Sequence, residues 1–477
     1  MSITSSEKPT GVRYTILLLL CCLAMITYID RAVVSNAKDD IMDSVGQDRA
    51  DMYYLLVAFQ LAYALFEIPT GWLGDRFGPR STLFRIVIWW TIFLSLTGLA
   101  GLKFGGETML IGFSALLLIQ FLFGMGEAGA FPNISRAIYN WFPASQRGFA
   151  SGCVWLSARL MGGLTPLIWL FMTDAGFLSL NWRQGFAIFA GLASLWCLIF
   201  YFWFRNTPLE HPRANEAERN FILAHHVPQS GSHSIPWKIL FGNANMRAIC
   251  GMYFCLNFAW YFFMYFLPGF MKENFGLPRT SIGALGGGLT VASADLAQST
   301  QQKILIAFFS GGPLLLGMFG CLIGGFLTDA YVRKTGDRKW GRRLFGMIGF
   351  GGASLSYILA LVFISNIYAF AFLIALAGFF NDLTMSSCWA TCQDVGRRNA
   401  AMVSGCMNMI GNLGAVLTNY VTGKILKSYT GADISQGYFL CISLFALAYF
   451  LGCLIWMKID ATKPIFPDSD DSLGAKK

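Results

Sequence analysis

Charged residues are scarce in this sequence. Asp, Glu, Lys and Arg make up only 13% of the 477 residues, whereas 55% of the residues are hydrophobic. A soluble domain has about a quarter of its residues charged. This scarcity excludes an ordinary soluble globular protein and indicates a chain that lies mostly in a lipid bilayer.

The sequence also lacks the motifs of catalytic and cofactor sites, since it contains no HExxH, no GxSxG and no phosphate-binding P-loop. Its twelve cysteines fall within apolar stretches and indicate neither a disulfide framework nor a metal site. We therefore expect no enzyme activity, no cofactor and no metal. The net charge of +9 is spread over short loops, which argues against nucleic-acid binding.

Long apolar stretches predict the fold. Twelve of them approach the roughly 20 residues that a helix needs to cross the hydrocarbon core of a membrane. We predict an all-α membrane protein with about twelve transmembrane helices in two halves, at residues 1–204 and 246–477, with a short tail at the end. The predicted spans are Tyr14–Val34, Met52–Leu73, Thr82–Leu102, Thr108–Phe131, Phe149–Met172, Gly185–Phe204, Met246–Leu267, Leu305–Thr328, Leu344–Ile364, Ala369–Trp389, Met402–Gly423 and Tyr438–Met457.

Two polar stretches interrupt this pattern. Residues 205–245 are predicted to form a central cytoplasmic loop between the halves. This loop holds all four histidines (His211, His225, His226 and His233), so that no histidine lies in a predicted span. Residues 281–303 are small and polar, and we expect an exposed loop there.

Lys and Arg are distributed unevenly over the two sides of the predicted spans. Only nine of the 35 fall in the loops of one side, while residues 333–343 alone give the other side six. Cytoplasmic loops carry the excess of Lys and Arg in membrane proteins. Both termini are therefore predicted to be cytoplasmic, in a multi-pass protein of the bacterial inner (plasma) membrane.

The sequence repeats itself at a spacing of about half its length. The pattern Gly71 to Asp75 follows the second span, and Gly325 to Asp329 follows the eighth span 254 positions later. Ser151–Cys153 and Ser404–Cys406 open the fifth and eleventh spans, 253 positions apart. Two unrelated patterns with nearly one spacing predict two parallel six-helix halves that share a central site.

These motifs carry a family resemblance. Gly71 to Arg80 resembles the loop signature of the major facilitator superfamily, G-x-L-x-D-R-x-G-x-R/K. The stretches Tyr28–Arg31, Gly126–Pro132, Trp141–Pro143 and Asn408–Asn412 resemble, more narrowly, the anion:cation symporter family. That family includes bacterial hexuronate, aldonate and aldarate importers and the vesicular glutamate and lysosomal sialic-acid carriers. The resemblance implies uptake of a small organic anion, foremost a sugar acid, usually together with protons. We expect the protein to function as a monomer.

Two arginines inside predicted spans are the candidates for binding the anion. Arg31 lies in span one and Arg159 in span five. A guanidinium group is costly within a membrane unless it is paired or used, and its planar fork fits a carboxylate. A structural ion pair with another span is the alternative for each. Neutral side chains suited to the hydroxyl groups of a sugar acid are Tyr28, Tyr261, Gln393, Asn408 and Asn412.

Because no histidine lies in a span, a proton relay has to use carboxylates. Glu127 lies between small residues in span four, and the family resemblance and its depth favour it as the proton-coupling residue. Asp30 is the second candidate. A static, hydrogen-bonded Glu127 is the alternative. We expect Glu67 and Asp382 to serve in helix packing.

A third group of charged residues lies at the predicted cytoplasmic ends of helices: Asp75, Arg76, Arg80 and, by the repeat, Asp329. A carboxylate at such a place can cap the N-terminus of a neighbouring helix and hold one conformation. We therefore expect these residues to gate the transporter and not to bind its solute.

One position departs from the family pattern. The resemblance leads us to expect an arginine seven residues before Glu127, and the sequence has Gln120 there. Arg159 would restore the missing charge from a neighbouring span. Otherwise the solute carries less negative charge, or Glu127 is tuned differently. A carrier of another carboxylate or of a phosphorylated solute, or a solute sensor that does not transport, remains an alternative.

Overall fold

The computed structural model describes residues 8–47, 52–103, 109–173, 178–224, 237–267, 270, 300–429 and 434–466. Within these ranges the chain is built from helices, and the one pairing of β type is an isolated bridge between Lys103 and Met109. The helices are α1 (Val12–Asn36), α2 (Lys38–Val45), α3 (Met52–Phe77), α4 (Pro79–Gly98), α5 (Phe113–Glu127), α6 (Ala130–Trp141), α7 (Arg147–Thr173), α8 (Trp182–Trp203), α9 (Glu216–Leu223), α10 (Trp237–Gly242), α11 (Ala244–Tyr265), α13 (Thr300–Thr335), α14 (Arg338–Val362), α15 (Ile367–Gly396), α16 (Ala400–Ser428) and α17 (Ile434–Trp456).

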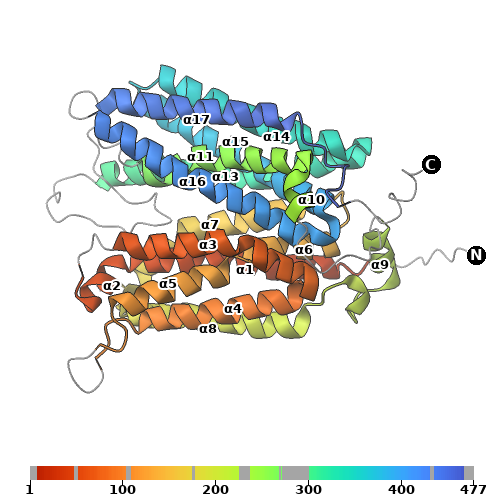
Figure 1. Ribbon diagram of the computed structural model, residues 1–477, viewed down its shortest axis with the longest axis horizontal. Coiled ribbons are helices and arrows are strands. Elements are labelled where there is room, and N and C mark those ends of the chain that lie inside the picture. The colour runs from red at the N-terminus through yellow and green to blue at the C-terminus, as the bar shows by residue number, and fades with distance from the viewer. Residues whose placement is uncertain are drawn as a thin grey trace, which may run out of the picture.

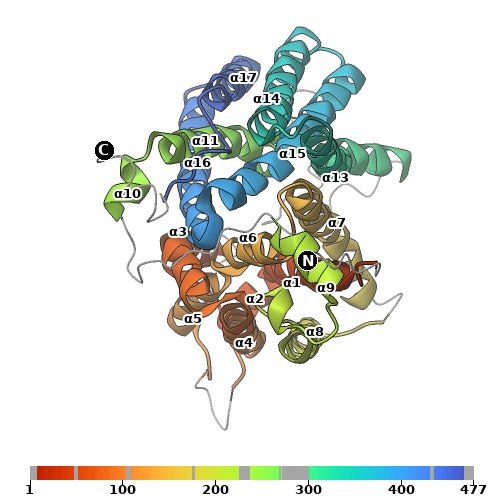
Figure 2. The same cartoon turned by 90° about the vertical axis from the view of Figure 1, so that its right-hand side faces the viewer.

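The long helices form two bundles that lie side by side (Figure 1). The N-terminal half contains α1, α3, α4, α5 with α6, α7 and α8, and the C-terminal half contains α11 and α13 to α17 (Figure 2). Nine stretches of the described residues are long and apolar enough to cross a membrane, and one of them, at residues 367–428, contains both α15 and α16. The long helices α7 and α11, with 27 and 22 residues, complete the pattern. The predicted fold class is confirmed.

Several helices extend beyond their predicted ends. The fourth span continues through α6 to Trp141, α3 to Phe77 and α15 to Gly396. Some polar residues in these extensions are buried against the other half of the protein, as Gln393 and Asp394 are. Hydropathy treats such residues as solvent-exposed and therefore ends the helix too early. Of the predicted loop at residues 281–303, residues 300–303 belong to α13, and the rest lies outside the described residues.

Side chains and glycine fix the ends of the helices. Asn181, Asn243, Asp337 and Asn366 each accept a hydrogen bond from a backbone N–H in the first turn of the helix that follows, which satisfies donors that a helix leaves unpaired. Gly78, with φ of 84°, makes the sharp turn from α3 to α4.

The two halves meet along two similar helix pairs, α3 with α16 and α7 with α13. Glycines allow the close approach. A Cβ atom on Gly71 or Gly405 would lie 2.6 Å from a backbone oxygen of the facing helix, and the same holds for Gly152 and Gly325 in the second pair. These glycines follow the spacing of the sequence repeat, so that the repeat is visible in the packing.

The two ends of the molecule differ. One end carries α9 and α10, and the other carries α2 (Figure 1). We call them the α9 end and the α2 end. At the α9 end, the buried carboxylate of Glu218 accepts hydrogen bonds from the backbone N–H groups of Val12 and Arg13, which ties the start of α1 to α9. His211 is buried there, with its ring beside that of Trp141, whereas the other three histidines lie outside the described residues.

Candidate functional site

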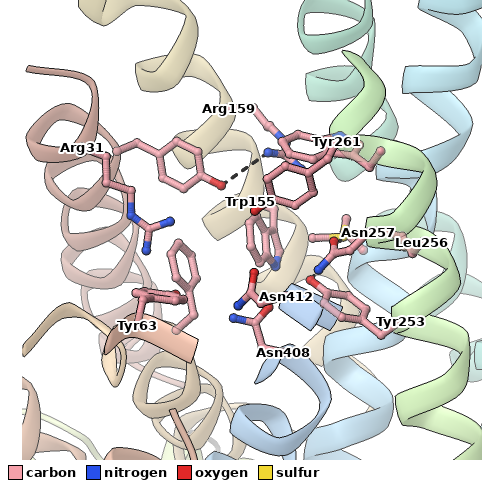
Figure 3. A pocket seen from close by; sticks show the side chains of 14 residues that line it. Arg31, Tyr63, Trp155, Arg159, Tyr253, Leu256, Asn257, Tyr261, Asn408 and Asn412 are labelled. Carbon is pink, nitrogen blue, oxygen red and sulfur yellow. Dashed lines mark hydrogen bonds between the residues drawn. The ribbon is translucent and has the colours of Figure 1, made fainter. Parts of the chain in front are cut away.

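A polar cavity lies between the two halves, with aromatic, arginine and amide side chains around it (Figure 3). Its empty space is about 470 Å³, which includes space open to solvent. The lining residues come from α1, α3, α6, α7, α11, α15 and α16. They are Tyr28, Arg31, Tyr63, Phe131, Trp155, Arg159, Tyr253, Leu256, Asn257, Trp260, Tyr261, Met385, Asn408 and Asn412.

Arg31 contacts both the cavity and Glu127. Its Nε donates a hydrogen bond to Glu127 Oε1 at 2.6 Å, which joins α1 to α5 within the N-terminal half. The guanidinium lies 4.4 Å from the ring centroid of Tyr63, close enough for a cation–π interaction. Among the described residues, Nη2 of Arg31 has no hydrogen-bond partner. One buried donor of Arg31 is therefore left unpaired while the arginine is paired with Glu127.

Arg159 forms a salt bridge between the halves. Its Nε and Nη2 donate to the two carboxylate oxygens of Asp382 on α15, at 3.0 and 3.1 Å. Nη1 lies 3.4 Å from the hydroxyl of Tyr28, the contact drawn as a dashed line in Figure 3. Arg159 and Asp382 are 4% and 1% exposed, so the bridge is almost fully shielded from water. The sequence analysis expected Asp382 to serve in helix packing and did not identify Arg159 as its salt-bridge partner.

Two amides of α16 connect the cavity to another buried carboxylate. Asn408 and Asn412 line the cavity, and both side-chain amides donate to Oε1 of Glu67 on α3. Asn412 also accepts a hydrogen bond from Gln60 at 3.4 Å. Asn257 on α11 lines the same cavity, and sequence reasoning missed it because a lone Asn in an apolar span carries little signal.

Several residues singled out from the sequence lie outside the cavity lining, among them Gln393, Gln120 and Asp30. Gln393 donates a hydrogen bond to Ser151 at 3.1 Å, in a smaller pocket between the cavity and the α9 end. Gln120 is buried and donates to Thr97 of α4 at 3.2 Å. Asp30 is 1% exposed, and neither of its carboxylate oxygens has a hydrogen-bond partner in the described part of the chain.

Two carboxylates link the halves at the α9 end. Asp75 of α3 accepts hydrogen bonds from the backbone N–H groups of Ala401 and Met402 in the first turn of α16, at 3.2 and 2.8 Å. Asp329 of α13 makes the corresponding contact with the first turn of α7, where the N–H groups of residues 148 and 149 lie at 3.1 and 2.6 Å. A carboxylate interacts favourably with the positive end of a helix dipole. This is the capping geometry that the gating hypothesis expects.

A buried ion-pair network extends the contact around Asp329. Arg342 donates to Asp329 at 2.8 Å and to Asp394 at 3.1 Å, and Arg147 of the other half donates to Asp394 at 2.6 Å. Sequence reasoning missed Arg342 because it falls in a basic cluster that reads as an exposed loop. Its side chain is fully buried.

The remaining two residues of the predicted gate contact their own half. Arg80 donates to the backbone oxygen of Tyr201 on α8 at 2.7 Å. Arg76 lies over the rings of Trp72 and Phe77, at 5.2 and 5.1 Å from their centroids. The arginine that pairs with Asp75 is Arg136 of α6, whose Nε lies 3.8 Å from Oδ1 of Asp75.

Aromatic rings separate the cavity from this charged network. Phe131 stacks on Trp155 with their centroids 4.7 Å apart, and Trp389 of the other half lies 5.4 Å from Trp155. These rings and the carboxylate contacts beyond them lie between the cavity and the α9 end. The structure thus shows the conformation in which the halves are joined at that end.

Two six-helix halves around one polar cavity, joined at one end by contacts between the halves, are the architecture of a secondary transporter. The chain belongs to the Major Facilitator Superfamily, whose sequence profile matches residues 20–335. It is therefore a multi-pass membrane transporter, and not an enzyme. The family resemblance drawn from Gly71 to Arg80 is confirmed.

Comparisons with known proteins agree with this assignment. The chain is 29% identical to the "Probable sulfoacetate transporter SauU" of Cupriavidus necator, over 88% of this chain and 89% of that one. It is 26% identical to the "Probable galactarate/D-glucarate transporter GudP" of Escherichia coli, over 94% and 95% of the two chains. Among solved structures, the proton:xylose symporter XylE has the same fold, with a TM-score of 0.69 at 14% identity, over 96% of this chain and 98% of XylE.

Proposed function

We propose that this transporter is a proton-coupled symporter of a small organic anion, foremost a sugar acid such as a hexuronate, aldonate or aldarate. The names of its relatives support the anion, since sulfoacetate, galactarate and D-glucarate each carry two acidic groups. The cavity supports it chemically. It presents two arginine side chains, from Arg31 and Arg159, together with the neutral amides of Asn257, Asn408 and Asn412.

The two kinds of side chain would divide the recognition of the solute. A guanidinium group binds a carboxylate through two parallel hydrogen bonds. The amides and the hydroxyls of Tyr28 and Tyr261 are matched to the hydroxyl groups of a polyol. In this proposal, Arg31 and Arg159 hold the acidic ends, and Asn408 and Asn412 contact the carbon chain between them. Gln393 lies too far toward the α9 end for direct contact in this conformation.

The observation that carries the proton coupling is the hydrogen bond between Arg31 and Glu127. A solute carboxylate and Glu127 compete for the same guanidinium. A proton on Glu127 removes its negative charge and releases Arg31 to the solute, so the proton and the anion bind together. Glu127 is 1% exposed, and a buried charge without a partner is costly. This cost favours two states of the carrier. In the empty state Glu127 is paired with Arg31, and in the loaded state Glu127 is protonated while Arg31 binds the solute.

Asp75 and Asp329 would then act as the gate, because the cavity opens to the α9 end only when their contacts with α16 and α7 break. We assign the α9 end to the cytoplasm, on the distribution of Lys and Arg. The remaining proposals are a location in a bacterial inner membrane, function as a monomer, and domain boundaries at residues 1–204, 205–245 and 246–477.

Uptake into proteoliposomes tests this function. A panel of radiolabelled acids, including galactarate, D-glucarate, a hexuronate and sulfoacetate, would be offered with an inward proton gradient. We expect accumulation of at least one acid, and its loss when a protonophore collapses the gradient at fixed sodium. Accumulation that survives the protonophore and depends on sodium would refute proton coupling. A matched variant, Glu127→Gln, should lose accumulation but retain exchange of labelled for unlabelled solute.

A short sulfonated acid is the second candidate solute. The match to a protein named as a sulfoacetate transporter favours it. A sulfonate presents three oxygens to an arginine but no hydroxyl groups to the amides. Uptake of sulfoacetate that exceeds uptake of every sugar acid in the panel would select this candidate.

A further inference from the structure

Glu67 is a carboxylate of the central region that the proposed mechanism does not use. It lies on α3 of the N-terminal half with no exposed surface. Its Oε1 accepts hydrogen bonds from the amides of Asn408 and Asn412 on α16 of the other half. Its second oxygen, Oε2, is buried and has no hydrogen-bond partner among the described residues.

The charges around the cavity make Glu67 unusual. Glu127 is paired with Arg31, and Asp382 is paired with Arg159. Glu67, like Asp30, has no basic group within salt-bridge distance in the described part of the chain. Unlike Asp30, it accepts hydrogen bonds across the interface, from the neutral amides of α16. A carboxylate that is removed from water without a counterion favours its neutral, protonated form.

The charged and titratable groups that face Glu67 are few. Arg31 from α1 and Tyr63 from α3 itself interact with Glu67. The negative charge of Glu127 from α5 interacts electrostatically with the same Tyr63. The facing part of α16 presents amides. Arg136, on the packed helix α6, is held by Asp75 near the α9 end. The arginines of α4, at positions 80 and 85, bond to backbone oxygens of residues 201 and 81 near that same end.

We propose that Glu67 is a second proton-binding site, which senses the solute through Asn408 and Asn412. These two amides both line the cavity and donate to Glu67, so a solute that accepts their hydrogen bonds draws them away from the carboxylate. The buried carboxylate then loses its donors and takes up one proton from water to become a neutral acid. Solute binding at the amides is thereby linked to proton uptake at a site that the solute does not touch.

The same contacts make Glu67 a sensor of the conformation. Its hydrogen bonds cross from α3 to α16, one of the two helix pairs at which the halves meet. A movement that separates these helices removes the amides from Glu67 in the same way as a solute does. A proton on Glu67 should therefore favour the state in which the α3–α16 contact is open.

Infrared spectroscopy of the purified transporter tests the site without any solute, because a protonated carboxyl group and a carboxylate absorb at separate frequencies. Spectra would be recorded between about pH 5 and pH 9, a range that includes the values found for buried glutamates. We expect a titrating component of the protonated carboxyl band in wild type that is missing from the spectra of Glu67→Gln, whereas any component from Glu127 or Asp30 remains in both. The matched control Glu216→Gln, at an exposed carboxyl of α9, should keep the Glu67 component. If Glu67→Gln removes only a carboxylate signal over the whole range, Glu67 stays ionised and the inference is overturned.

A double variant keeps the test decisive if Glu67→Gln folds poorly. Asn408→Ala combined with Asn412→Ala removes the donors and should move the midpoint of the band to higher pH. An unchanged midpoint in this variant would refute the link to the amides.

The link to transport rests on the proposed function and is measured separately. Calorimetry with galactarate, in two buffers of different ionisation enthalpy, gives the number of protons taken up per solute bound. Wild type should take up more protons than Glu67→Gln, and Glu67→Gln in a Glu127→Gln background should remove the remainder. Binding without proton uptake in wild type would refute the coupling proposed above. Equal uptake by wild type and Glu67→Gln would refute the role of Glu67 alone.

Discussion

Asp75 and Asp329 make the same contact in opposite directions across the interface between the halves. The carboxylate of Asp75 reaches from the N-terminal half to the first turn of α16, and that of Asp329 reaches from the C-terminal half to the first turn of α7. Both bonds lie at the α9 end. Two related carboxylates thus contribute to the interface at this end, and in the proposed gate both contacts break before the cavity opens there.

Asp75→Asn should weaken this closed conformation. An asparagine is uncharged, so it loses the interaction with the helix dipole, which contributes up to about 2 kcal/mol in partly buried places. We expect a shift of roughly tenfold in the conformational equilibrium, slower turnover and little change in solute affinity. Hydrogen exchange at the amides of Ala401 and Met402 measures the opening.

Asp337→Asn is the matched control for this change. Asp337 caps the N-terminus of α14 within one half, through the backbone N–H of Trp340, and makes the same kind of bond without crossing the interface. It should leave exchange at the start of α16 unchanged. A large loss of equilibrium solute binding in a folded Asp75→Asn sample would contradict a gating role.

Gly152→Ala should also disfavour the closed conformation, by crowding. The added Cβ would lie 2.6 Å from the backbone oxygen of Cys321 on α13, closer than any ordinary contact. Overpacking of this kind costs about 1–3 kcal/mol. The distance between spin labels on α7 and α13 at the α9 end should increase.

Gly163→Ala, on the same helix α7, provides the comparison. A Cβ there meets no atom within 4 Å, so this variant should behave like wild type. If Gly152→Ala and Gly163→Ala give the same distance distribution, close packing at Gly152 does not determine the conformation.

The fold was predictable because its signals extend over long stretches. Each span needs about 20 apolar residues, and an error of a few residues leaves the number of spans unchanged. The repeat that links Asp75 to Asp329 predicted parallel halves, and the glycines of the interface follow the same spacing. The end of α15 was not predictable, because Gln393 and Asp394 there are polar yet buried against the other half.

Some residues of the cavity were predictable from the sequence, but the residues with which they pair were not. Arg31 and Arg159 stand out because a guanidinium in an apolar span is rare, and both line the cavity. Their partners depend on how each helix is rotated and which half it faces. Asp382 lies 223 positions from Arg159 in the sequence, and no periodicity relates the two. The gating, binding and coupling roles remain predictions for the experiments described above and below.

The start of α1 should loosen in acid. Burial alone would raise the pKa of Glu218, but hydrogen bonds from Thr10, from the backbone N–H groups of Arg13 and Val12, and the charge of Arg13 together lower that pKa. A lowered pKa means that the contact stabilises the fold above the ordinary carboxyl pKa of about 4.3. This stability is lost as the pH falls through the lower value of the folded state.

Glu218→Gln should reproduce the acid state at neutral pH, with faster hydrogen exchange at the amides of Val12 and Arg13. The exposed neighbour Glu216, changed to Gln, should have no such effect. Unchanged exchange in Glu218→Gln would show that the start of α1 is held by packing and not by this carboxylate.

Arg159→Gln should weaken solute binding strongly, if Arg159 holds one end of the anion. The loss of one partner from a buried, charge-assisted contact costs about 2–5 kcal/mol, which is about 30-fold or more in affinity. The single variant also leaves Asp382 buried without its partner, which by itself destabilises the protein. A loss of binding in this variant alone would therefore not separate recognition from folding.

The double variant Arg159→Gln with Asp382→Asn separates the two, because it removes both charges and keeps two hydrogen-bonding side chains of similar size. It should fold like wild type, as judged by thermal unfolding, and still bind the solute at least 30-fold more weakly. Gln120→Arg should not restore binding in this background, because the side chain at position 120 contacts Thr97 on α4 and lies outside the cavity lining. If the folded double variant binds like wild type, Arg159 serves only to join the halves, and Arg31 alone holds the anion.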